Sequence, residues 1–409
     1  MNKLADFLVR LGGALLEYGS PVHRIEEVLN LTAQRYDHSC EVFAVPTGLW
    51  LSISSTDEEN AEPLVRLVRV YSWSTDLIKL QELDSLFNLV MAGAMPIPKA
   101  LTKLKKITKS PRSYPLWREY LVTGAICGSA GLFFGGRWGE VLVSTLLGFL
   151  VVSLFQLVQQ RQQTRLLIDF LVGLFTGLVV WGATALQPDL LRKPMILAGI
   201  IVIVPGMTLT VGLGELVHRQ LVSGGARLLH AAMVFVSMIL GLSVAIKIES
   251  WSLGGEPVSL GLASSTAAHP LWLTALVACF AGFAFADLFN VSNKYRLWAA
   301  LSCLVAWVVS SAAATFLTSG PLAAFGGAFG LGLYANVLTR ITGKPNQIFL
   351  LPGLFLLVPG TVGFLGFERF LNGDANQGVL FAFAAIMNGG ALITGLIVAN
   401  AALSPRKLL

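Results

Sequence analysis

IVIVPGMTLT, at residues 201–210, carries a proline-glycine pair in the middle of a long apolar run, and LLVPGTVGF, at residues 356–364, carries the same pair in a second run. Val204-Pro205-Gly206 and Val358-Pro359-Gly360 are separated by 358 − 204 = 154 residues. A Pro-Gly pair breaks a helix, and in hydrocarbon the released backbone groups must find partners in protein or trapped water. The two stretches therefore predict a membrane protein with one interrupted helix in each of two related halves.

Other glycines repeat at the same offset. They are Gly128 and Gly282, Gly173 and Gly327, Gly212 and Gly366, Gly224 and Gly378, and Gly241 and Gly395. With Pro205 matching Pro359 and Gly206 matching Gly360, these five glycine pairs bring the total to seven matches in one register. The matches indicate a duplicated unit. A duplicated membrane unit with a broken helix in each copy is typical of secondary transporters.

The composition is that of an integral membrane protein. Of the 409 residues, 55% are hydrophobic and 13% are charged, and the mean hydropathy is +0.70, whereas a soluble domain carries about 25% charged residues. The net charge of +6 is modest and the basic residues gather beside apolar runs, so we expect a lipid bilayer and no nucleic acid as partner. The four cysteines fit neither a disulfide framework nor a metal site, and no cleavable signal peptide is recognised.

Residues 1–118 read as a small α+β domain. We expect its helices and strands, in chain order, at about 3–18, 21–36, 41–47, 49–54, 64–70 and, as two or three helices, 76–109. From Lys99 to Arg118, seven residues are basic and none is acidic. Beside the first apolar run, this basic juxtamembrane segment predicts that the domain is cytoplasmic.

Ten apolar runs after this domain are long enough to cross a bilayer, at about 20 residues each. We expect them at about 119–136, 140–158, 167–186, 195–213, 226–246, 270–288, 296–317, 320–338, 347–367 and 378–401. The 154-residue offset pairs the first span with the sixth and the fourth with the ninth. Since five is an odd number, the second copy must cross the membrane upside down relative to the first. The prediction is a mainly α integral membrane protein with ten transmembrane helices in a 5+5 inverted repeat, 119–246 and 270–401.

The basic residues between the spans set the orientation. The loops predicted to be cytoplasmic, with the C-terminus, hold ten of them: Arg161, Arg165, Arg219, Arg227, Lys294, Arg296, Arg340, Lys344, Arg406 and Lys407. The outer loops hold five: Arg137, Arg192, Lys193, Lys247 and Arg369. Cytoplasmic loops carry the excess of Lys and Arg, so both termini are expected in the cytoplasm and the protein is multi-pass in the cell (inner) membrane.

The two Pro-Gly breaks are the candidate substrate site. Each lies near the middle of its span, and polar or flexible residues surround the breaks, so the substrate-binding candidates are Pro205, Gly206, Thr208, Thr210, Pro359, Gly360 and Thr361. Pro352-Gly353 is expected to make a further break two turns before Pro359. Half-helix N-termini offer N–H groups to a carboxylate, and loosened carbonyls can take an ammonium, so a small zwitterion suits the site. A plain proline kink is the structural alternative.

Few other polar residues occur within the spans. Asn336 and Asn388 either line the substrate site or form hydrogen bonds between helices. Ionisable groups at membrane depth are functional candidates, so Glu215, His230 and Asp287 are proton-coupling candidates. The structural alternative for Glu215 and Asp287 is a charged group near the end of a span, and for His230 a histidine that packs between helices.

Enzymatic alternatives find little support in the chain. No phosphate-binding glycine loop appears, so ATP-driven pumping is not expected. His23, Glu26, Glu27 and His38 raise a metal or hydrolase hypothesis, but they supply no third ligand and no nucleophile–base pair, and His23 and Glu27 can simply belong to a surface salt-bridging face. We therefore expect no catalytic residue, no metal and no cofactor.

Several linked motifs resemble the threonine/serine exporter family. They are Tyr18-Gly-Ser-Pro-Val-His-Arg-Ile-Glu26, Val45-Pro-Thr-Gly48, Leu80-Gln-Glu-Leu-Asp84, Tyr114-Pro-Leu-Trp117, Phe133-Phe-Gly-Gly-Arg-Trp138, Val204-Pro-Gly-Met-Thr-Leu-Thr210 and Ser223-Gly-Gly-Ala-Arg227. The matched positions include His23, Arg24, Glu26, Pro205, Gly206, Gly224 and Arg227. The resemblance implies ten membrane helices, a cytoplasmic N-terminal domain, and export of threonine and serine driven by the membrane potential and proton gradient. Glu215 stands where the family pattern leads us to expect an aspartate.

Three functions remain in competition. The first is a secondary active exporter of threonine and serine that works by alternating access with protons as coupling ion. The second is a dicarboxylate exporter, because relatives built from two subunits are linked to succinate export. The third is a membrane-anchored hydrolase, for which ten duplicated spans are far more than an anchor needs. A homo-oligomer is compatible with all three.

Overall fold

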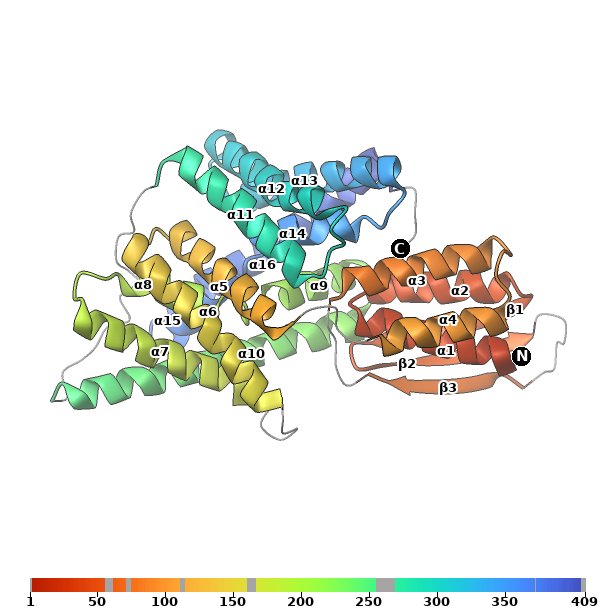
Figure 1. Cartoon of the computed structure of the whole chain (residues 1–409), viewed down its shortest axis with the longest axis horizontal. Helices are drawn as coiled ribbons and strands as arrows, with labels where there is room; N and C mark the ends of the chain where they lie inside the picture. The colour runs from red at the N-terminus through yellow and green to blue at the C-terminus, as the bar shows by residue number, and fades with distance from the viewer. Residues whose placement is uncertain are drawn as a thin grey trace.

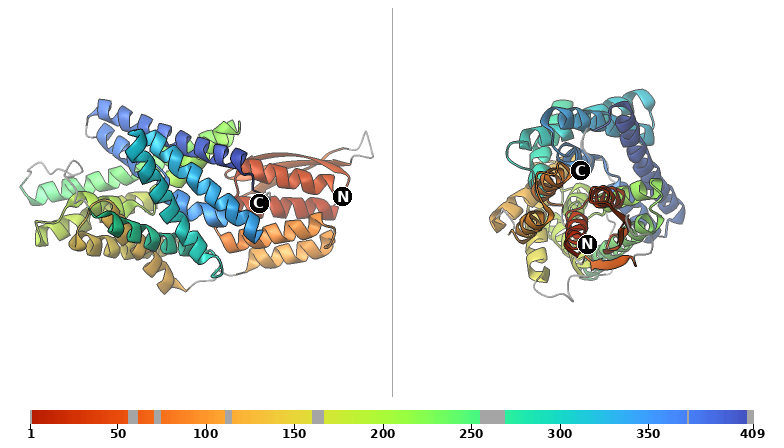
Figure 2. Two further views of the ribbon diagram at one scale, coloured as in Figure 1. Left: turned by 90° about the horizontal axis from the view of Figure 1, so that it is seen from above. Right: turned by 90° about the vertical axis from the view of Figure 1, so that its right-hand side faces the viewer.

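The structure, a computed structural model, describes residues 2–55, 62–70, 75–110, 115–159, 167–254, 269–371 and 373–405. It consists of an N-terminal α+β domain joined end to end with a larger bundle of apolar helices, as Figures 1 and 2 show. We call the N-terminal domain the soluble domain, after the expectation from the sequence. Of the residues used to predict the orientation, Arg161, Arg165, Arg406 and Lys407 lie outside the described ranges.

The N-terminal domain contains four helices and a three-stranded antiparallel sheet of order β1-β2-β3. Its elements are α1 (Asn2–Glu17), α2 (Val22–Gln34), β1 (His38–Val45), β2 (Gly48–Ser55), β3 (Leu64–Arg69), α3 (Leu77–Met91) and α4 (Ile97–Lys109). α1 and α2 pack on the sheet, and α3 and α4 pack on α1 and α2. The expected α+β domain with a small sheet is confirmed.

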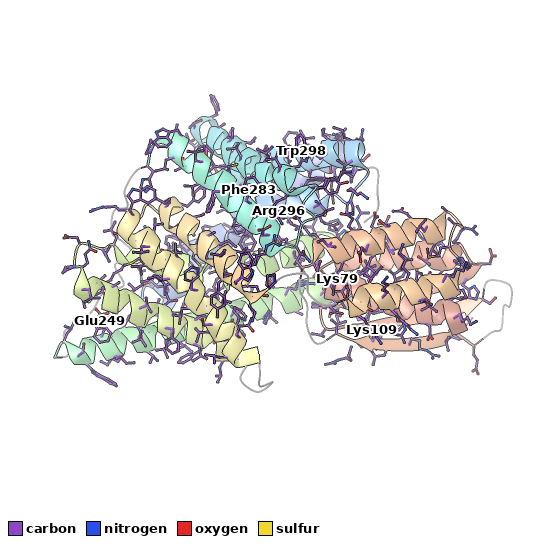
Figure 3. All side chains as sticks on the ribbon, in the orientation of Figure 1. Lys79, Lys109, Glu249, Phe283, Arg296 and Trp298 are labelled. Atoms are coloured by element: carbon purple, nitrogen blue, oxygen red, sulfur yellow. The ribbon has the colours of Figure 1, made fainter. Side chains whose placement is uncertain are left out.

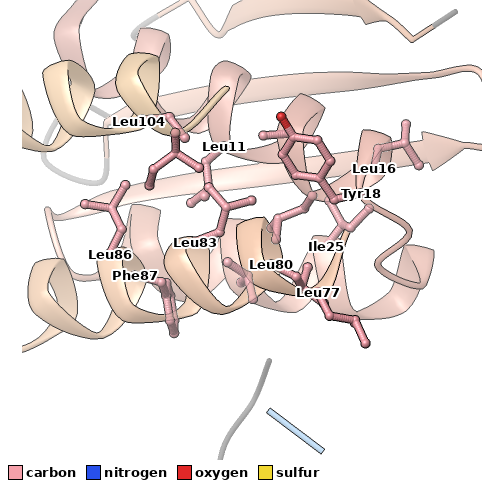
Figure 4. Close-up of a cluster of buried hydrophobic side chains, with 14 of the residues drawn as sticks. Leu11, Leu16, Tyr18, Ile25, Leu77, Leu80, Leu83, Leu86, Phe87 and Leu104 are labelled. Atoms are coloured by element: carbon pink, nitrogen blue, oxygen red, sulfur yellow. The ribbon is translucent and has the colours of Figure 1, made fainter. Parts of the chain in front are cut away.

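Regular spacing of apolar residues explains the core of this domain. Leu8, Leu11 and Leu15 recur every three or four residues along α1 and are fully buried, as a helix face requires. In β2, Leu49 and Leu51 alternate with more exposed residues and are fully buried as well. Figure 4 shows Leu11 in the cluster that the helices enclose.

The apolar bundle is built from twelve helices among the described residues. They are α5 (Leu116–Phe133), α6 (Trp138–Gln159), α7 (Ile168–Leu186), α8 (Arg192–Ile200), α9 (Gly206–Val217), α10 (Leu221–Ser252), α11 (Leu271–Leu288), α12 (Arg296–Leu317), α13 (Gly320–Thr342), α14 (Gln347–Leu357), α15 (Gly360–Leu371) and α16 (Ala375–Ala402). The helical membrane protein predicted from the composition is therefore confirmed.

Eight spans among the described helices are long and apolar enough to cross a membrane. They include α14 and α15 taken together as 347–369, but neither α5 nor the α8–α9 pair. In the latter case, the break before Pro205 divides one expected span into two short helices, and α9 has only 12 residues. Length and composition alone thus support eight of the ten spans expected from the sequence.

We call α5–α10 the first half of the bundle and α11–α16 the second half; their helices have corresponding packing partners. In the first half, α5 packs on α6, α7 on α10, α6 on α8, and α9 on α10. In the second half, α11 packs on α12, α13 on α16, α12 on α14, and α15 on α16. The halves meet where α5 packs against α11, where α9 contacts α15 and α16, and where α10 contacts α15.

α5 and α11 run antiparallel to each other. At the beginning of α5, Arg118 Nη2 lies 2.9 Å from Asp287 Oδ1 at the end of α11. Just beyond the end of α5, the Gly136 carbonyl oxygen lies 2.9 Å from His269 Nε2, just before α11 begins. The first helix of each half therefore begins at an opposite end of the bundle.

Candidate functional site

Two proline-linked breaks interrupt helices in the middle of the bundle. α8 ends at Ile200, residues 201–205 form turns, and α9 begins after Pro205. α14 ends at Leu357, and Val358 adopts an extended conformation before Pro359, which is the conformation that a following proline favours. Since proline lacks the N–H group that a helix interior requires, each break follows from the local sequence.

The two breaks lie directly against each other. A Cβ atom built on Gly206 would lie 3.1 Å from the Gly360 Cα atom and 2.8 Å from Val358 Cγ2. A Cβ atom on Gly360 would in turn lie 3.1 Å from the Gly206 Cα atom and would collide with Val204 Cγ1. The absence of a side chain at both positions is what allows α9 and α15 to begin in contact.

A cavity of about 220 Å³ adjoins this contact. Its lining residues come from both halves and are mostly apolar: Ile126, Ser129, Ala130, Phe133, Phe134, Ile201, Val204, Gly206, Ala281, Phe285, Phe355, Leu356, Val358, Gly360 and Thr361. For comparison, a cavity of roughly 150 Å³ holds benzene. The space is therefore sufficient for a molecule with the few heavy atoms of a small amino acid.

The cavity combines polar helix ends with apolar walls. Gly206 begins α9, and Gly360 and Thr361 begin α15, so two helix N-termini border the same space. The first turn of a helix leaves N–H groups without intrahelical acceptors, and its partial positive charge of about +0.5 favours an anionic group. None of the described lining residues is basic or acidic. The arrangement can hold a carboxylate through backbone dipoles alone.

The other threonines near the first break do not line the cavity. Thr210 is buried, and its Oγ1 atom donates a 3.0 Å hydrogen bond to the Gly206 carbonyl oxygen one turn earlier. Thr208 is half-buried on the same helix. Pro205 and Pro359 are both buried at the breaks, where they end the helical hydrogen bonding.

The expected further break at Pro352-Gly353 is wrong. α14 continues through Pro352 to Leu357. Packing accounts for this, because neighbouring helices can hold a proline-containing membrane helix together. A Cβ atom on Gly353 would lie 2.6 Å from the Ser302 carbonyl oxygen, and Cys303 Sγ donates to the Pro352 carbonyl oxygen at 3.1 Å. The pair therefore brings α14 close to α12.

The two asparagine candidates lie away from the cavity lining. Asn336 Nδ2 donates 2.8 Å hydrogen bonds to Asn400 Oδ1 and to the Leu403 carbonyl oxygen, which ties α13 to the end of α16. Asn388 lies on α16 opposite the beginning of α13, and its buried Oδ1 atom has no hydrogen-bond partner. Of the two alternatives for Asn336, the geometry agrees with a bond between helices.

Glu215 belongs to a buried polar cluster at the far end of α9. Its side chain is 1% exposed, and Oε2 accepts hydrogen bonds from Ser223 Oγ at 2.6 Å and Arg227 Nε at 3.0 Å. The Oε1 atom is buried without a partner. Glu215 follows Gly206 by nine residues, or roughly 13 Å at 1.5 Å per residue. It is thus separate from the cavity but lies on the same half-helix.

The two remaining proton-coupling candidates have different surroundings. Asp287 Oδ1 lies 2.9 Å from Arg118 Nη2 and 2.8 Å from Arg296 Nε, so two guanidinium groups hold this carboxylate where α5, α11 and α12 meet. His230 is exposed on α10. Neither Asp287 nor His230 is among the described residues that line the cavity.

The soluble domain touches the first half through what we call the first-half contact. The His23 and His218 rings stack with centroids 4.2 Å apart and planes 2° from parallel, and Gln220 Nε2 donates to Glu26 Oε2 at 2.7 Å. Burial and then the charges of His218 and Arg24 lower the pKa of His23 to about 4. Burial raises the pKa of Glu26, against the effect of its hydrogen bonds.

A separate second-half contact joins the soluble domain to the loop between α11 and α12. The Leu77 N–H donates to the Phe289 carbonyl oxygen at 3.0 Å, and Asn290 Nδ2 donates to Asp76 Oδ1 at 2.8 Å. Both contacts lie at the end of the bundle opposite Glu249, which Figure 3 labels together with Lys79 of the soluble domain. The two contacts together form the junction between the soluble domain and the bundle, and His23 and Glu26 belong to it through the first-half contact.

Ser129 is the polar residue of the described cavity lining that the sequence analysis missed. It lies on α5, is 5% exposed, and its Oγ atom is buried without a hydrogen-bond partner. The one available signal was a hydroxyl in the apolar stretch between Gly128 and Phe133, and such residues are common in membrane helices as packing groups.

Comparison with known proteins agrees with this architecture. Residues 6–249 match the family model described as "Putative threonine/serine exporter", and residues 274–402 match the one described as "Threonine/Serine exporter, ThrE". The two matches together run from the soluble domain through α16, with a gap between 249 and 274.

Relatives occur in bacteria and fungi. The "Probable threonine/serine exporter" of Mycobacterium tuberculosis is 25% identical over 98% of this chain and 77% of its own length. "Pheromone-regulated membrane protein 10" of Yarrowia lipolytica is 25% identical over 95% of this chain, and the protein of that name from Eremothecium gossypii is 25% identical over 87%. The chain spans only 31% and 48% of these two fungal relatives.

No solved structure matches this chain. The resemblance inferred from the linked motifs is nevertheless confirmed by the two family models, which cover both the soluble domain and the two sets of apolar helices. The chain belongs to the threonine/serine exporter family.

Proposed function

We propose that this protein is a secondary active exporter of small amino acids, threonine and serine, which works by alternating access. The observation that supports this most directly is the contact between Gly206 and Gly360, where two half-helices begin beside a cavity of about 220 Å³. Binding sites at the crossing of discontinuous helices are typical of secondary transporters.

The proposed architecture has ten spans in a 5+5 inverted repeat, with a domain of residues 1–118 followed by halves at 119–246 and 270–401. The corresponding packing partners and the antiparallel course of α5 and α11 support an inverted relation. A pseudo-two-fold axis would then pass through the α5–α11 and α9–α15 contacts. Rocking of one half against the other about this axis would open the cavity to alternate sides.

In the proposed orientation, the protein lies in the cell (inner) membrane and both termini are in the cytoplasm. The soluble domain contacts the loops before α10 and before α12. The described basic residues at this end are Arg219, Arg227, Lys294, Arg296, Arg340 and Lys344, against Arg137, Arg192, Lys193, Lys247 and Arg369 at the opposite end. The basic segment from Lys99 to Arg118, with seven Lys and Arg in the sequence, adds to the excess at this end. The positive-inside rule assigns the richer end to the cytoplasm.

The proposed substrate is a zwitterion whose carboxylate is held by the N-termini of α9 and α15. A dicarboxylate carries a second negative charge that needs a cationic partner, and none of the described cavity-lining residues is basic. The carbonyl ends of α8 and α14, represented in the lining by Ile201 and Leu356, are suited to an ammonium group. These features favour an amino acid over succinate.

The proposed coupling ion is the proton, and Glu215 is the first candidate to carry it. Its side chain is buried, has one unpartnered oxygen, and lies on the half-helix that begins at the cavity. Protonation would release Arg227 from the carboxylate, so movement of α9 and the charge state of Glu215 would be linked. Asp287, held between two arginines, and the exposed His230 are weaker candidates.

The test is transport by the purified full chain in proteoliposomes. Labelled threonine or serine should leave the vesicles faster when a proton gradient is imposed, and a protonophore should abolish the difference. Movement of labelled succinate with no movement of either amino acid would overturn the proposal in favour of a dicarboxylate exporter.

A further inference from the structure

Among the residues that the structure describes, the buried hydroxyl group of Ser129 has no hydrogen-bond partner. Other helical hydroxyls of the bundle bond the carbonyl one turn earlier: Ser153 Oγ donates to the Phe149 carbonyl oxygen at 3.0 Å, and Thr145 Oγ1 to that of Val141 at 2.9 Å. Ser129 Oγ is buried without such a bond, in the wall of the central cavity. A buried polar group without a partner is destabilising, so a ligand in the cavity that bonds it would gain affinity.

The other groups that border the cavity suit the carboxylate and the ammonium of an amino acid, so its side chain is the part that Ser129 can contact. The helix N-termini at Gly206 and Gly360 suit the carboxylate, and the carbonyl ends of α8 and α14 suit the ammonium. Ser129 lies on α5, apart from both breaks in sequence, and Phe133 and Phe285 supply apolar surface in the same lining. A substrate side chain with one hydroxyl group on a short carbon chain could bond Ser129 and pack against Phe133 and Phe285.

We propose that Ser129 determines specificity by hydrogen bonding the side-chain hydroxyl of the transported amino acid. The inference rests on the proposed function, because it assumes that the cavity holds the substrate. Ser129 is contributed by the first half alone: its counterpart at 129 + 154 = 283 is Phe283, which is 37% exposed. The inverted halves therefore supply equivalent backbone groups but only one such hydroxyl at this position.

The test compares serine with alanine, which differs from serine only in lacking the hydroxyl. Each amino acid is used to inhibit uptake of labelled serine by counterflow in proteoliposomes that contain the full chain. The wild-type protein should prefer serine. In Ser129→Ala, the inhibition constant of alanine divided by that of serine should fall by about fivefold, which corresponds to the net contribution of about 1 kcal/mol typical of a neutral hydrogen bond. Ser129→Thr, which keeps the hydroxyl, should retain the preference.

Ser144→Ala is a matched control. Ser144 Oγ is also buried without a partner, but Ser144 lies on α6 outside the cavity lining. This variant should keep the wild-type ratio, so a general effect of removing an unpartnered hydroxyl can be recognised. Thermal unfolding in detergent shows whether each variant is folded.

The outcomes separate this inference from the proposed function. If the wild-type protein transports serine and Ser129→Ala prefers serine as strongly as before, the role of Ser129 is wrong and the exporter remains. An equal loss of preference in Ser144→Ala would overturn the inference too, because the effect would not depend on the cavity. If the wild-type protein transports neither serine nor threonine, the proposed function itself fails.

Discussion

Adding a methyl group at Gly360 tests whether the two helix breaks really touch in the working protein. In Gly360→Ala, the new Cβ atom would lie 3.1 Å from the Gly206 Cα atom and would also collide with Val204 Cγ1. The backbone atom cannot rotate away, and the β-branched valine has few alternative rotamers. Since overpacking of this kind typically costs about 1–3 kcal/mol, we expect a destabilisation of that size.

The matched control is Gly390→Ala. Gly390 lies within α16, and a Cβ atom there would meet nothing within 4 Å. Replacing a helical glycine with alanine normally stabilises by roughly 0.5–1 kcal/mol. Thermal unfolding of both variants in the same detergent, and serine efflux from proteoliposomes, measure the two effects side by side.

Transport should respond more strongly than stability. Alternating access requires α9 and α15 to move past each other at their closest point, so Gly360→Ala should reduce serine efflux by at least tenfold while Gly390→Ala leaves it near the wild-type rate. Equal stability and equal efflux in the two variants would refute the reasoning, because the contact between the breaks would then have no physical consequence.

Three further outcomes follow from the buried polar groups. Glu215→Gln should make serine efflux insensitive to an imposed proton gradient while counterflow persists; efflux that still follows the gradient would exclude this residue as the coupling group. Arg192→Ala leaves Glu249, which is 3% exposed, without its paired guanidinium. The Arg192 side chain is 25% exposed, so the cost should be smaller than the roughly 3–5 kcal/mol of a fully buried pair, and the thermal midpoint in detergent should still drop below that of wild type. The pKa of His23 is lowered from 6.5 to about 4, so its contribution to folding stability is complete above pH 6.5 and is lost as the pH falls toward 4. Between pH 7.5 and 5, the thermal midpoint of His23→Phe should therefore fall less than that of the wild-type protein.

The sequence allowed the elements with local causes to be predicted. Proline and glycine act on their own backbone, so the breaks at Pro205 and Pro359 could be located without knowing the packing. Alternation in Leu49–Ser54 likewise indicated a strand, and β2 covers that stretch. Pro352 failed as a prediction because its effect depends on α12, which packs closely enough against Gly353 to keep α14 continuous.

Side chains whose role depends on distant partners could not be assigned in advance. Asn336 and Ser129 are both polar residues in apolar helices, but the sequence analysis considered only Asn336. Packing separates them: Asn336 donates two hydrogen bonds to the end of α16, whereas Ser129 Oγ has no partner and lies in a cavity wall. The difference arises from contacts between residues far apart in the chain.

The soluble domain contacts both halves of the bundle, so the proposed transport cycle must change its contacts. If the halves rock against each other, the first-half contact and the second-half contact cannot both persist unchanged. The second-half contact includes a backbone hydrogen bond from Leu77 to Phe289, while the interactions described above for the first-half contact, the stacked imidazoles and the Gln220–Glu26 hydrogen bond, are made by side chains. Side-chain contacts separate without disturbing secondary structure, and His218 directly follows α9, the half-helix that begins at the cavity. Rocking would therefore open the first-half contact, and the soluble domain would move with the second half.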